Sequence, residues 1–504
     1  MTLIKKNIAA NFAGSIWQSL MALIFIPLYI KFMGIESLGL IVIFATLQGI
    51  FGLLDMGLSS TLNREMSRLS VLPSKEQEMR NLVRTLEVLY WSIAVFVGIT
   101  VVALSPFITH HWVKAGQLSP ETIEQAFLIM GFVIALQMPV GFYSGGLMGL
   151  QRQVLLNAIN VGISTLRGAG AILILWLVSP TIQAYFLWQI VTSAINIFLL
   201  VFFLWRRLPL GDNKAVFQKQ LFKGIWRFTA GMSGIAILAT ILTQLDKVIL
   251  SKMLSLEMFG YYALASMVAM SIARLFTPVF YSIYPRLTQL VSLNDQEGLK
   301  QLYHESCQFM SVLVLPVAVV IALFSREILL LWTQDPTTVE QCYLLTSILV
   351  CGTAINGLMN FPYALQLASG WTSLSFFKNV IAVILLVPLI IYMAVHYGAI
   401  GAASVWFILN LGYVFFEIPI MHRRLLPKEK WRWYWEDVCI PLAVCILTAG
   451  LGRIFVRGPM SQFVMLLYLI IISVLTLGMV SITTPVTRAW LLKRLLIIKA
   501  ACGS

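Results

Sequence analysis

The stretch KFMGIESLGL, which begins at Lys31, returns as KMLSLEMFGY, which begins at Lys252. Three residues are identical in the two copies: Lys31 and Lys252, Glu36 and Glu257, and Gly39 and Gly260. Each copy lies between two long apolar runs. Arg64 and Arg286 each follow the end of an apolar run, and their separation along the chain nearly equals the separation of the two copies. An internal repeat of this size in an apolar chain predicts two halves with the same fold.

The composition indicates that the solvent of this chain is lipid. Of its 504 residues, 59% are apolar and only 11% are charged, and the mean hydropathy is +0.87. Since lipid offers no partner for backbone N–H and C=O groups, apolar stretches of about 20 residues are expected to form helices. Fourteen such stretches are predicted as spans: 12–32, 39–62, 84–105, 126–149, 155–178, 182–205, 226–250, 260–283, 308–332, 342–366, 376–396, 398–421, 438–456 and 461–482.

These stretches predict an all-α polytopic membrane protein with about 14 transmembrane helices. Six spans separate the two copies of the repeat, so both halves enter the membrane in the same direction. We therefore expect two parallel six-helix lobes around a central cavity, plus two C-terminal helices. The expected parts are an N-terminal lobe over 1–210, a C-terminal lobe over 211–425, and a segment over 426–504 with an interfacial stretch, two helices and a basic cytoplasmic tail.

The positions of Lys and Arg predict the orientation. Most of the 35 basic residues fall in the N-terminal segment, in alternate connections and in the C-terminal tail, which places both termini in the cytoplasm. This bias also accounts for the net charge of +14 without a nucleic-acid partner. The basic and aromatic stretch KEKWRWYWED, from Lys428, is interpreted as an interfacial anchor at the edge of a span.

Enzyme, metal and nucleotide functions find little support. The six Cys form no CxxC pair, the five His are scattered, and no phosphate-binding Gly-rich loop with Lys and Ser/Thr occurs. The connections are too short for a catalytic domain. We expect a protein that is not an enzyme and that uses no cofactor or metal, powered by an ion gradient, a partner or downhill movement.

Ionisable side chains inside spans are the candidates for function, because each costs about 2.5–3.5 kcal/mol at a helix centre. Arg167 lies in the middle of the fifth span, and Asn157, Asn160 and Ser164 share its helix face. Arg274 lies in the eighth span, so each half supplies one arginine. Both arginines are candidates for an anionic cargo, with ion pairing inside the protein as the alternative.

Acidic side chains also lie in or near spans. Asp55 lies in the second span and Asp246 in the seventh, while Glu417 lies near the inner end of the twelfth. For Asp246, beside Lys247, and for Glu417 we favour a structural role. Pro27, Pro139, Pro278 and Pro388 are candidate bending points.

Several stretches resemble a known family: IPLYIKFMGIESLGL from Ile26, LLDMGLSSTLNREMSRL from Leu53, and LDKVILSKMLSLEMFGYYALA from Leu245. Over about residues 5–425 they resemble the polysaccharide-repeat-unit (O-antigen, Wzx-type) flippases of the multidrug/oligosaccharidyl-lipid/polysaccharide exporter superfamily. The resemblance implies a multi-pass protein of the bacterial cytoplasmic (inner) membrane. Its implied activity is translocation of an undecaprenyl-pyrophosphate-linked oligosaccharide from the cytoplasmic to the outer leaflet by alternating access.

The resemblance also implies roles for residues and partners. In this family a cationic central cavity binds the cargo, a role that would fall on Arg167 and Arg274, with Arg64 and Lys378 near the inner mouth. The candidates for binding sugars are Asn157, Asn160, Asn356, Asn360 and Asn410. The implied partners are the lipid-linked oligosaccharide and the bilayer, with a polysaccharide polymerase and a chain-length regulator in the same pathway.

Other functions stay open at this point. A cation-coupled multidrug exporter of the same superfamily would use Asp55 or Asp246 to bind the coupling ion. The lipid II flippases of the superfamily have fourteen helices, the number predicted here. A membrane polymerase or ligase acting on a polyprenyl-linked sugar is disfavoured by the short outer loops.

Overall fold

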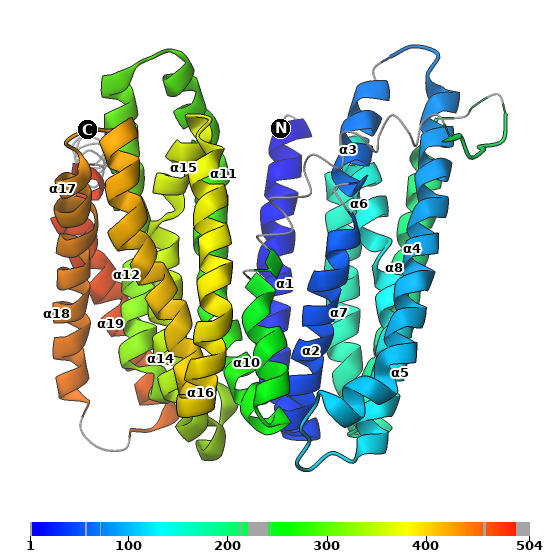
Figure 1. The fold of residues 1–504 in the computed structure, drawn as a ribbon, viewed down its shortest axis with the longest axis horizontal. Coiled ribbons are helices and arrows are strands. Elements are labelled where there is room, and N and C mark those ends of the chain that lie inside the picture. The colour runs from blue at the N-terminus through cyan, green and yellow to red at the C-terminus, as the bar shows by residue number, and fades with distance from the viewer. Residues whose placement is uncertain are drawn as a thin grey trace, which may run out of the picture. The chain divides into compact units, whose positions relative to one another are not determined.

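The structure is a computed structural model that describes residues 3–55, 58–70, 72–209, 211, 213–219, 240–241, 243–456 and 460–489. The chain forms two compact units, Met1–Gly260 and Tyr261–Ser504. Throughout the described residues the regular secondary structure is helical (Figure 1). The prediction of an all-α membrane protein is therefore confirmed.

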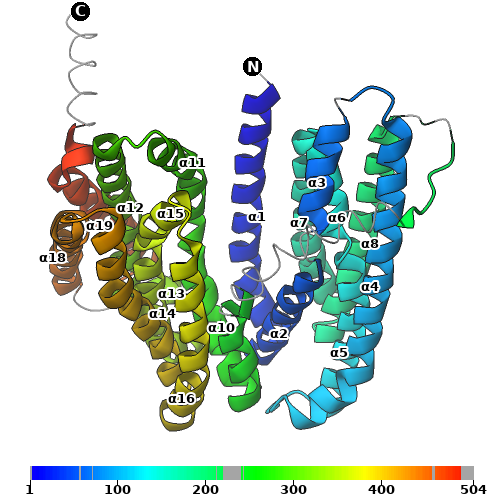
Figure 2. The ribbon, with the colours of Figure 1, turned by 45° about the horizontal axis from the view of Figure 1, so that its top comes forward.

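In the first unit, long helices lie side by side, as α4, α5 and α8 do in both views (Figures 1 and 2). Helix α1 packs along α7, and the short α3 packs against α6. The elements of this unit are α1 (Leu3–Met33), α2 (Ile35–Phe51), η1 (Gly52–Asp55), α3 (Leu58–Leu69), α4 (Glu76–His111), α5 (Pro120–Gln137), α6 (Val140–Gly149), α7 (Gln153–Leu177) and α8 (Ile182–Arg207). Helix α10 (Leu256–Ser271) begins in this unit and continues into the second.

In the second unit, α12 is the central helix and contacts α11, α14, α18 and α19. The last two long helices pack on α12 through an apolar cluster that includes Val320, Ala449 and Leu469. The elements are α11 (Ala273–Ser292), α12 (Gln296–Leu323), α13 (Ser325–Thr333), α14 (Pro336–Leu358), α15 (Asn360–Ala368), α16 (Thr372–Leu425), α17 (Lys430–Arg432), the π-helical η2 (Trp433–Cys439), α18 (Ile440–Phe455) and α19 (Gln462–Thr483).

The described residues contain 12 helical segments long and apolar enough to cross a membrane. One of them, Ser373–Leu425, has 53 residues, about 80 Å of helix, far more than a bilayer core of about 30 Å. At Gly398 its backbone leaves the helical region, with φ 59° and ψ −144°, and the ribbon reverses there (Figure 1). This segment therefore contains both the eleventh and the twelfth predicted spans. Most of the predicted seventh span, 226–250, lies outside the described residues.

Four predicted spans, two in each half, are interrupted in their helical hydrogen bonding at corresponding places, and the ninth, 308–332, is also interrupted, at Phe324 between α12 and α13. The second span breaks at Gly52, where η1 separates α2 from α3, and the eighth breaks at Ile272, between α10 and α11. The fourth breaks at Pro139, between α5 and α6, and the tenth at Met359, between α14 and α15. The breaks therefore recur in corresponding spans of the two halves.

The breaks also hold corresponding positions along the chain. Gly52 lies as many residues after Lys31 as Ala273 lies after Lys252. Pro139 and Asn360 are also equivalent positions when they are counted from these two lysines. Local chemistry explains two of them. Pro139 has no N–H to donate, and the Asn360 side chain donates to the carbonyl oxygens of Asn356 and Gly357 at 3.2 and 3.0 Å, in competition with the backbone. The repeat seen in ten residues thus extends to the architecture.

The two copies of the repeat contact each other within the first unit. A Cβ atom added to Gly39 would lie 2.8 Å from the carbonyl oxygen of Leu256, and one added to Gly260 would lie 2.4 Å from that of Ile35. Ile35 and Leu256 are themselves equivalent positions of the repeat. Each glycine therefore lets one helix approach the first turn of the other, and the two contacts are related by the internal symmetry.

The repeated glutamate of the first copy holds an adjacent loop. Glu36 is buried, and its carboxylate oxygens accept hydrogen bonds from the backbone N–H groups of Gly116, Gln117 and Leu118 at 2.9–3.0 Å. The same loop reaches the second copy, because the N–H of Leu256 donates to the carbonyl oxygen of Lys114 at 2.7 Å. The loop between α4 and α5 is thus fastened to both copies of the repeat.

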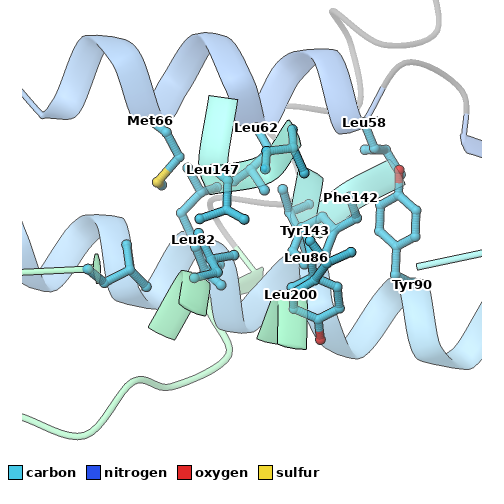
Figure 3. Close-up of a cluster of buried hydrophobic side chains, with 14 of the residues drawn as sticks. Leu58, Leu62, Met66, Leu82, Leu86, Tyr90, Phe142, Tyr143, Leu147 and Leu200 are labelled. Carbon is cyan, nitrogen blue, oxygen red and sulfur yellow. The ribbon is translucent and has the colours of Figure 1, made fainter. Parts of the chain in front are cut away.

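A cluster of buried apolar side chains forms a core of the first unit (Figure 3). It joins α3, α4, α6 and α8 through fully buried side chains such as Leu62, Leu86 and Leu200. Two tyrosines belong to it, and their hydroxyl groups point in opposite directions, that of Tyr90 toward the start of α3 beside Leu58 and that of Tyr143 away from the cluster (Figure 3). Each hydroxyl therefore reaches a polar group at the margin of the cluster.

Candidate functional site

Polar residues gather at the helix breaks of the first unit. At the break of the second span, the Asp55 carboxylate accepts hydrogen bonds from the Ser59 backbone N–H at 3.2 Å and from its hydroxyl at 2.6 Å. The Ser59 hydroxyl also lies 2.8 Å from the hydroxyl of Tyr90. Asp55 thus caps the start of α3, where a carboxylate is stabilised by the free N–H groups of a helix.

A second polar group connects the second, fourth and sixth spans. The Gln48 amide donates to Gln137 at 2.5 Å, and the Gln137 amide donates to the hydroxyl of Ser193 at 2.8 Å. Gln137 is the last residue of α5, directly before the break at Pro139. This group was not among the candidates from the sequence, although glutamines inside apolar spans are a signal that could have indicated it.

Arg167 lies on α7 and is enclosed by aromatic rings of two other helices. Tyr29 of α1 and Tyr185 of α8 lie near it, and the rings of the two tyrosines meet edge to face with centroids 5.2 Å apart. The Nε atom of Arg167 is buried and has no hydrogen-bond partner. Among the described residues no carboxylate lies within the 4.0 Å of an ion pair with Arg167. The hypothesis of internal ion pairing therefore finds no support for this arginine.

The remaining sequence candidates of the first unit have different surroundings. Asn157 donates to the Asn11 side chain at 2.6 Å and to the Gln153 carbonyl oxygen at 2.8 Å, so it links α7 to α1. Asn160 is half-buried on the same helix. Arg64 is exposed on α3, with its Nε 4.0 Å from Glu65. The carboxylate of Asp246 lies 3.2 Å from the ammonium of Lys247, the next residue in the chain.

Arg274 lies in the second unit, two residues beyond Ile272, where the eighth predicted span is interrupted. Its side chain is exposed, and within the described part of the chain no carboxylate forms an ion pair with it. Arg167 and Arg274 are thus two arginines in predicted spans, one in each unit, whose charges are not neutralised by a neighbouring carboxylate. Because such charges are costly in a membrane, both arginines remain candidate functional residues.

Three asparagines meet at the break of the tenth span. The Asn356 amide donates to Asn410 at 2.8 Å, and Asn360 donates to the backbone carbonyl of Asn356. Asn410 is fully buried and also donates to the carbonyl oxygen of Trp406 at 2.8 Å. The structure therefore brings Asn356, Asn360 and Asn410 together, and the same bonds join α14 to α16.

Lys378 is neutralised by an ion pair. Its Nζ lies 2.9 Å from both carboxylate oxygens of Glu417, which also accepts from the Gln366 amide at 2.7 Å. The ring of Tyr413 lies 4.5 Å from the Lys378 ammonium and that of Tyr363 lies 5.7 Å from it. Glu417 is buried, as expected for its predicted structural role, but its partner lies 39 residues away along the chain.

An aromatic group in the second unit was missed by sequence reasoning. The ring of Phe280 stacks on Tyr284, with centroids 5.6 Å apart and planes at 6°, and on Tyr363, with centroids 6.2 Å apart. Phe280 and Tyr284 lie on α11, and Tyr363 lies on α15, about one turn beyond the break at Met359. Aromatic faces with polar hydroxyl ends suit the mixed surface of a sugar. The motif YSIYP, from Tyr281, was the available signal.

A polar hollow of about 420 Å³ lies elsewhere in the second unit, where α12 meets the segment after α16. Four glutamates line it, and buried His304 lies 2.5 Å from Asp437 and 3.2 Å from Glu429. With Lys300 and Arg432 as the only cations in its lining, this hollow carries net negative charge and is unsuited to a pyrophosphate. The anion candidates are therefore the arginines of the spans.

These features define a class: a polytopic membrane protein with a duplicated core whose helices are interrupted at polar residues, as in many transporters. Two solved structures show the same fold. Lipid II flippase MurJ, in an inward closed conformation, aligns with a TM-score of 0.67 at 14% identity, over 94% of this chain and 98% of MurJ. An inward-facing multidrug resistance MATE family transporter of the MOP superfamily aligns with a TM-score of 0.59 at 15% identity, over 83% and 94%.

The sequence comparisons give the family. Residues 4–291 match the family described as "Polysaccharide biosynthesis protein", and the chain belongs to this family. A curated relative, "Putative O-antigen transporter" of Shigella flexneri, is 22% identical over 402 residues, which cover 80% of this chain and 93% of the relative. The resemblance recognised from the residues is thereby confirmed, while the roles of individual site residues stay predictions.

Proposed function

We propose that the protein is a flippase that moves undecaprenyl-pyrophosphate-linked oligosaccharide repeat units from the cytoplasmic to the outer leaflet, by alternating access, for surface polysaccharide biosynthesis. It would work in the bacterial inner membrane with both termini in the cytoplasm. The lobes would be 1–210 and 211–425, with 426–504 as an addition. The family membership and the relative named as an O-antigen transporter support this proposal.

The observation that carries the proposal is the pair of arginines without carboxylate partners. Arg167 and Arg274 each supply a forked, permanently charged donor, which suits the oxygens of a pyrophosphate. Each lobe would contribute one arginine, so that the cargo contacts both during transport. Asn356, Asn360 and the rings of Tyr284 and Tyr363 would bind the sugars, while the polyprenyl chain stays in lipid.

The test replaces the arginines by a neutral residue of similar shape. A charge-assisted hydrogen bond contributes about 1.5–3 kcal/mol, so Arg167→Gln or Arg274→Gln should each reduce transport about tenfold or more. Lipid-linked repeat units should then accumulate on the inner leaflet, measured by extraction after labelling. Arg326→Gln is the matched control, since Arg326 is an exposed arginine paired with Glu340. Normal export by both variants, at normal protein levels in the membrane, would show that the arginines do not bind cargo.

A second candidate is a lipid II flippase, favoured by the likeness of the whole fold to MurJ. Deleting the protein separates the candidates. If the protein carries the oligosaccharide repeat unit, its deletion should make the lipid-linked repeat unit accumulate and leave lipid II unchanged. Accumulation of lipid II would favour the lipid II flippase instead. Unchanged lipid-linked sugars with increased sensitivity to cationic drugs would instead favour a cation-coupled exporter.

A further inference from the structure

A hollow of about 680 Å³ on the surface of the first unit has a charged end and an apolar trough. It lies on α4, α6 and α8, and its lining includes Arg84, Val88, Trp91 and Val95 of α4. These four residues stand at spacings of four, three and four, so they form one stripe along the helix. The hollow therefore follows the helix axis, with a cation at one end and apolar side chains beyond it.

The charged end is built around a buried carboxylate. Glu87 accepts hydrogen bonds from the Tyr143 hydroxyl at 2.6 Å, the Trp205 indole at 3.2 Å and the Arg84 guanidinium at 2.7 Å. The Tyr143 hydroxyl that makes this bond points away from the apolar cluster (Figure 3). The Glu87 carboxylate thus has three hydrogen-bond donors, while 50% of the Arg84 side chain is exposed.

A second arginine makes this end positively charged. Arg80 lies one turn before Arg84, over the Trp205 ring at 5.5 Å, and its buried Nε has no hydrogen-bond partner. Counted over Arg80, Arg84 and Glu87, this end has one positive charge in excess, although Arg80 itself lies outside the lining of the hollow. A ligand that binds there is expected to be an anion.

The apolar part of the hollow faces the surroundings of the unit. Val88 is 41% exposed and Val95 is 52% exposed, and the neighbouring Phe96 and Ile99 are more exposed still. Exposed apolar side chains on a predicted span face lipid. From Arg84 to Val95 the helix rises about 16 Å, which is half of a bilayer core of about 30 Å. The stripe therefore has the length of one leaflet, with its cation where the phosphates of that leaflet lie.

We propose that this hollow binds one anionic phospholipid of the bilayer, with its phosphate on Arg84 and one acyl chain along Val88, Trp91 and Val95. Basic pockets between membrane helices favour anionic head groups, and the net charge here selects against zwitterionic lipids. The site is independent of the transported cargo and of the proposed function.

The test titrates purified protein with phosphatidylglycerol and with phosphatidylcholine of the same acyl chains, and counts bound lipids by native mass spectrometry. The wild type should retain one phosphatidylglycerol at least about tenfold more tightly than phosphatidylcholine, because both lipids offer a phosphate to Arg84 but the choline ammonium of the latter is repelled by the arginines. Glu87→Gln frees the Arg84 guanidinium and should strengthen the retention several-fold. Arg84→Gln combined with Glu87→Gln removes the guanidinium that would hold the phosphate while the formal charge of this end stays the same, and should abolish the selective retention.

Two further variants separate binding from folding. Val95→Trp, at an exposed position, fills the trough and should displace the lipid without disturbing packing. Arg68→Gln is the matched control, because Arg68 is 55% exposed and pairs with Glu65 at 2.8 Å, as Arg84 pairs with Glu87, but lies outside the hollow. Equal retention of the two lipids by the wild type, unchanged retention in Val95→Trp, or an equal loss in Arg68→Gln would overturn the proposal. A polyprenyl phosphate as the co-purified ligand would overturn it as well.

Discussion

Adding a methyl group at Gly260 should destabilise the first unit. The new Cβ would lie 2.4 Å from the Ile35 carbonyl oxygen, about 1 Å inside the 3.4 Å at which ordinary contact begins. The atom it meets belongs to the backbone, so the two helices must separate. Overpacking of this kind costs about 1–3 kcal/mol, and each kcal/mol lowers the midpoint of thermal unfolding by roughly 2–4 °C in domains of a few hundred residues.

The loss of helical circular dichroism on heating in detergent measures this unfolding, whereas a thiol-reactive dye would not, because all six Cys of the chain lie within the second unit. Gly450→Ala is the matched control: it replaces a helical glycine with nothing within 4 Å of the new Cβ. This control should leave the midpoint unchanged or raise it slightly, since alanine favours helix over glycine.

The internal symmetry predicts how two such changes combine. Gly39→Ala should act like Gly260→Ala but less severely, since its Cβ would lie 2.8 Å from the nearest atom. One separation of the helices relieves both clashes, so the double variant should lose at least about 0.5 kcal/mol less than the sum of the single losses. Strictly additive losses, or no loss at Gly260, would refute the reciprocal contact.

Three further predictions follow from buried charges and helix caps. Glu417→Gln leaves the Lys378 ammonium unpaired and should cost about 3–5 kcal/mol, most of it recovered when Lys378→Met is added. A thiol-reactive dye measures this unfolding in detergent, because Cys307, Cys342 and Cys445 are buried in the same unit. Glu36→Ala leaves three backbone N–H groups without their acceptor, at about 1–3 kcal/mol for each that stays buried, and limited proteolysis should cut the loop over 112–119 faster than in the wild type. Burial raises the pKa of Asp335, but hydrogen bonds from Thr338 and Thr337 outweigh it and hold the pKa below its usual value. This stabilisation is present above the unfolded pKa of about 3.9 and is lost as the pH falls through the folded one, so Asp335→Asn should lower the unfolding midpoint at pH 7 and change it less near pH 3.

The architecture was predictable from the sequence because hydropathy and the repeat are properties of local sequence. Three identities at Lys31, Glu36 and Gly39 correctly indicated duplicated halves, and the spans followed from their apolar length. Apart from Pro139, which had been named as a candidate bending point, the interruptions within spans were not predicted, since apolar runs such as 39–62 and 260–283 continue through them. Only Pro139 gave a local signal for a break.

The contacts of the candidate residues depended on the tertiary fold and could not be read from the sequence. Glu36 accepts from N–H groups about 80 residues away, which any side chain could carry. Lys378 was expected to face the cargo, yet it meets Glu417, a partner that no spacing rule indicates. Arg167 was correctly placed inside a span, and its lack of a carboxylate partner became visible only with the structure.

The central claim is that the protein carries lipid-linked oligosaccharide across the membrane on its two span arginines. The most direct measurement reconstitutes the purified protein in liposomes with labelled polyprenyl-pyrophosphate oligosaccharide, and follows the fraction that a non-permeant glycosidase can cut from outside. The wild type should raise this fraction with time, while a protein carrying both Arg167→Gln and Arg274→Gln should stay at the level of empty liposomes. An equal fraction with and without the wild-type protein, or equal rates for the wild type and the double variant, would contradict the account.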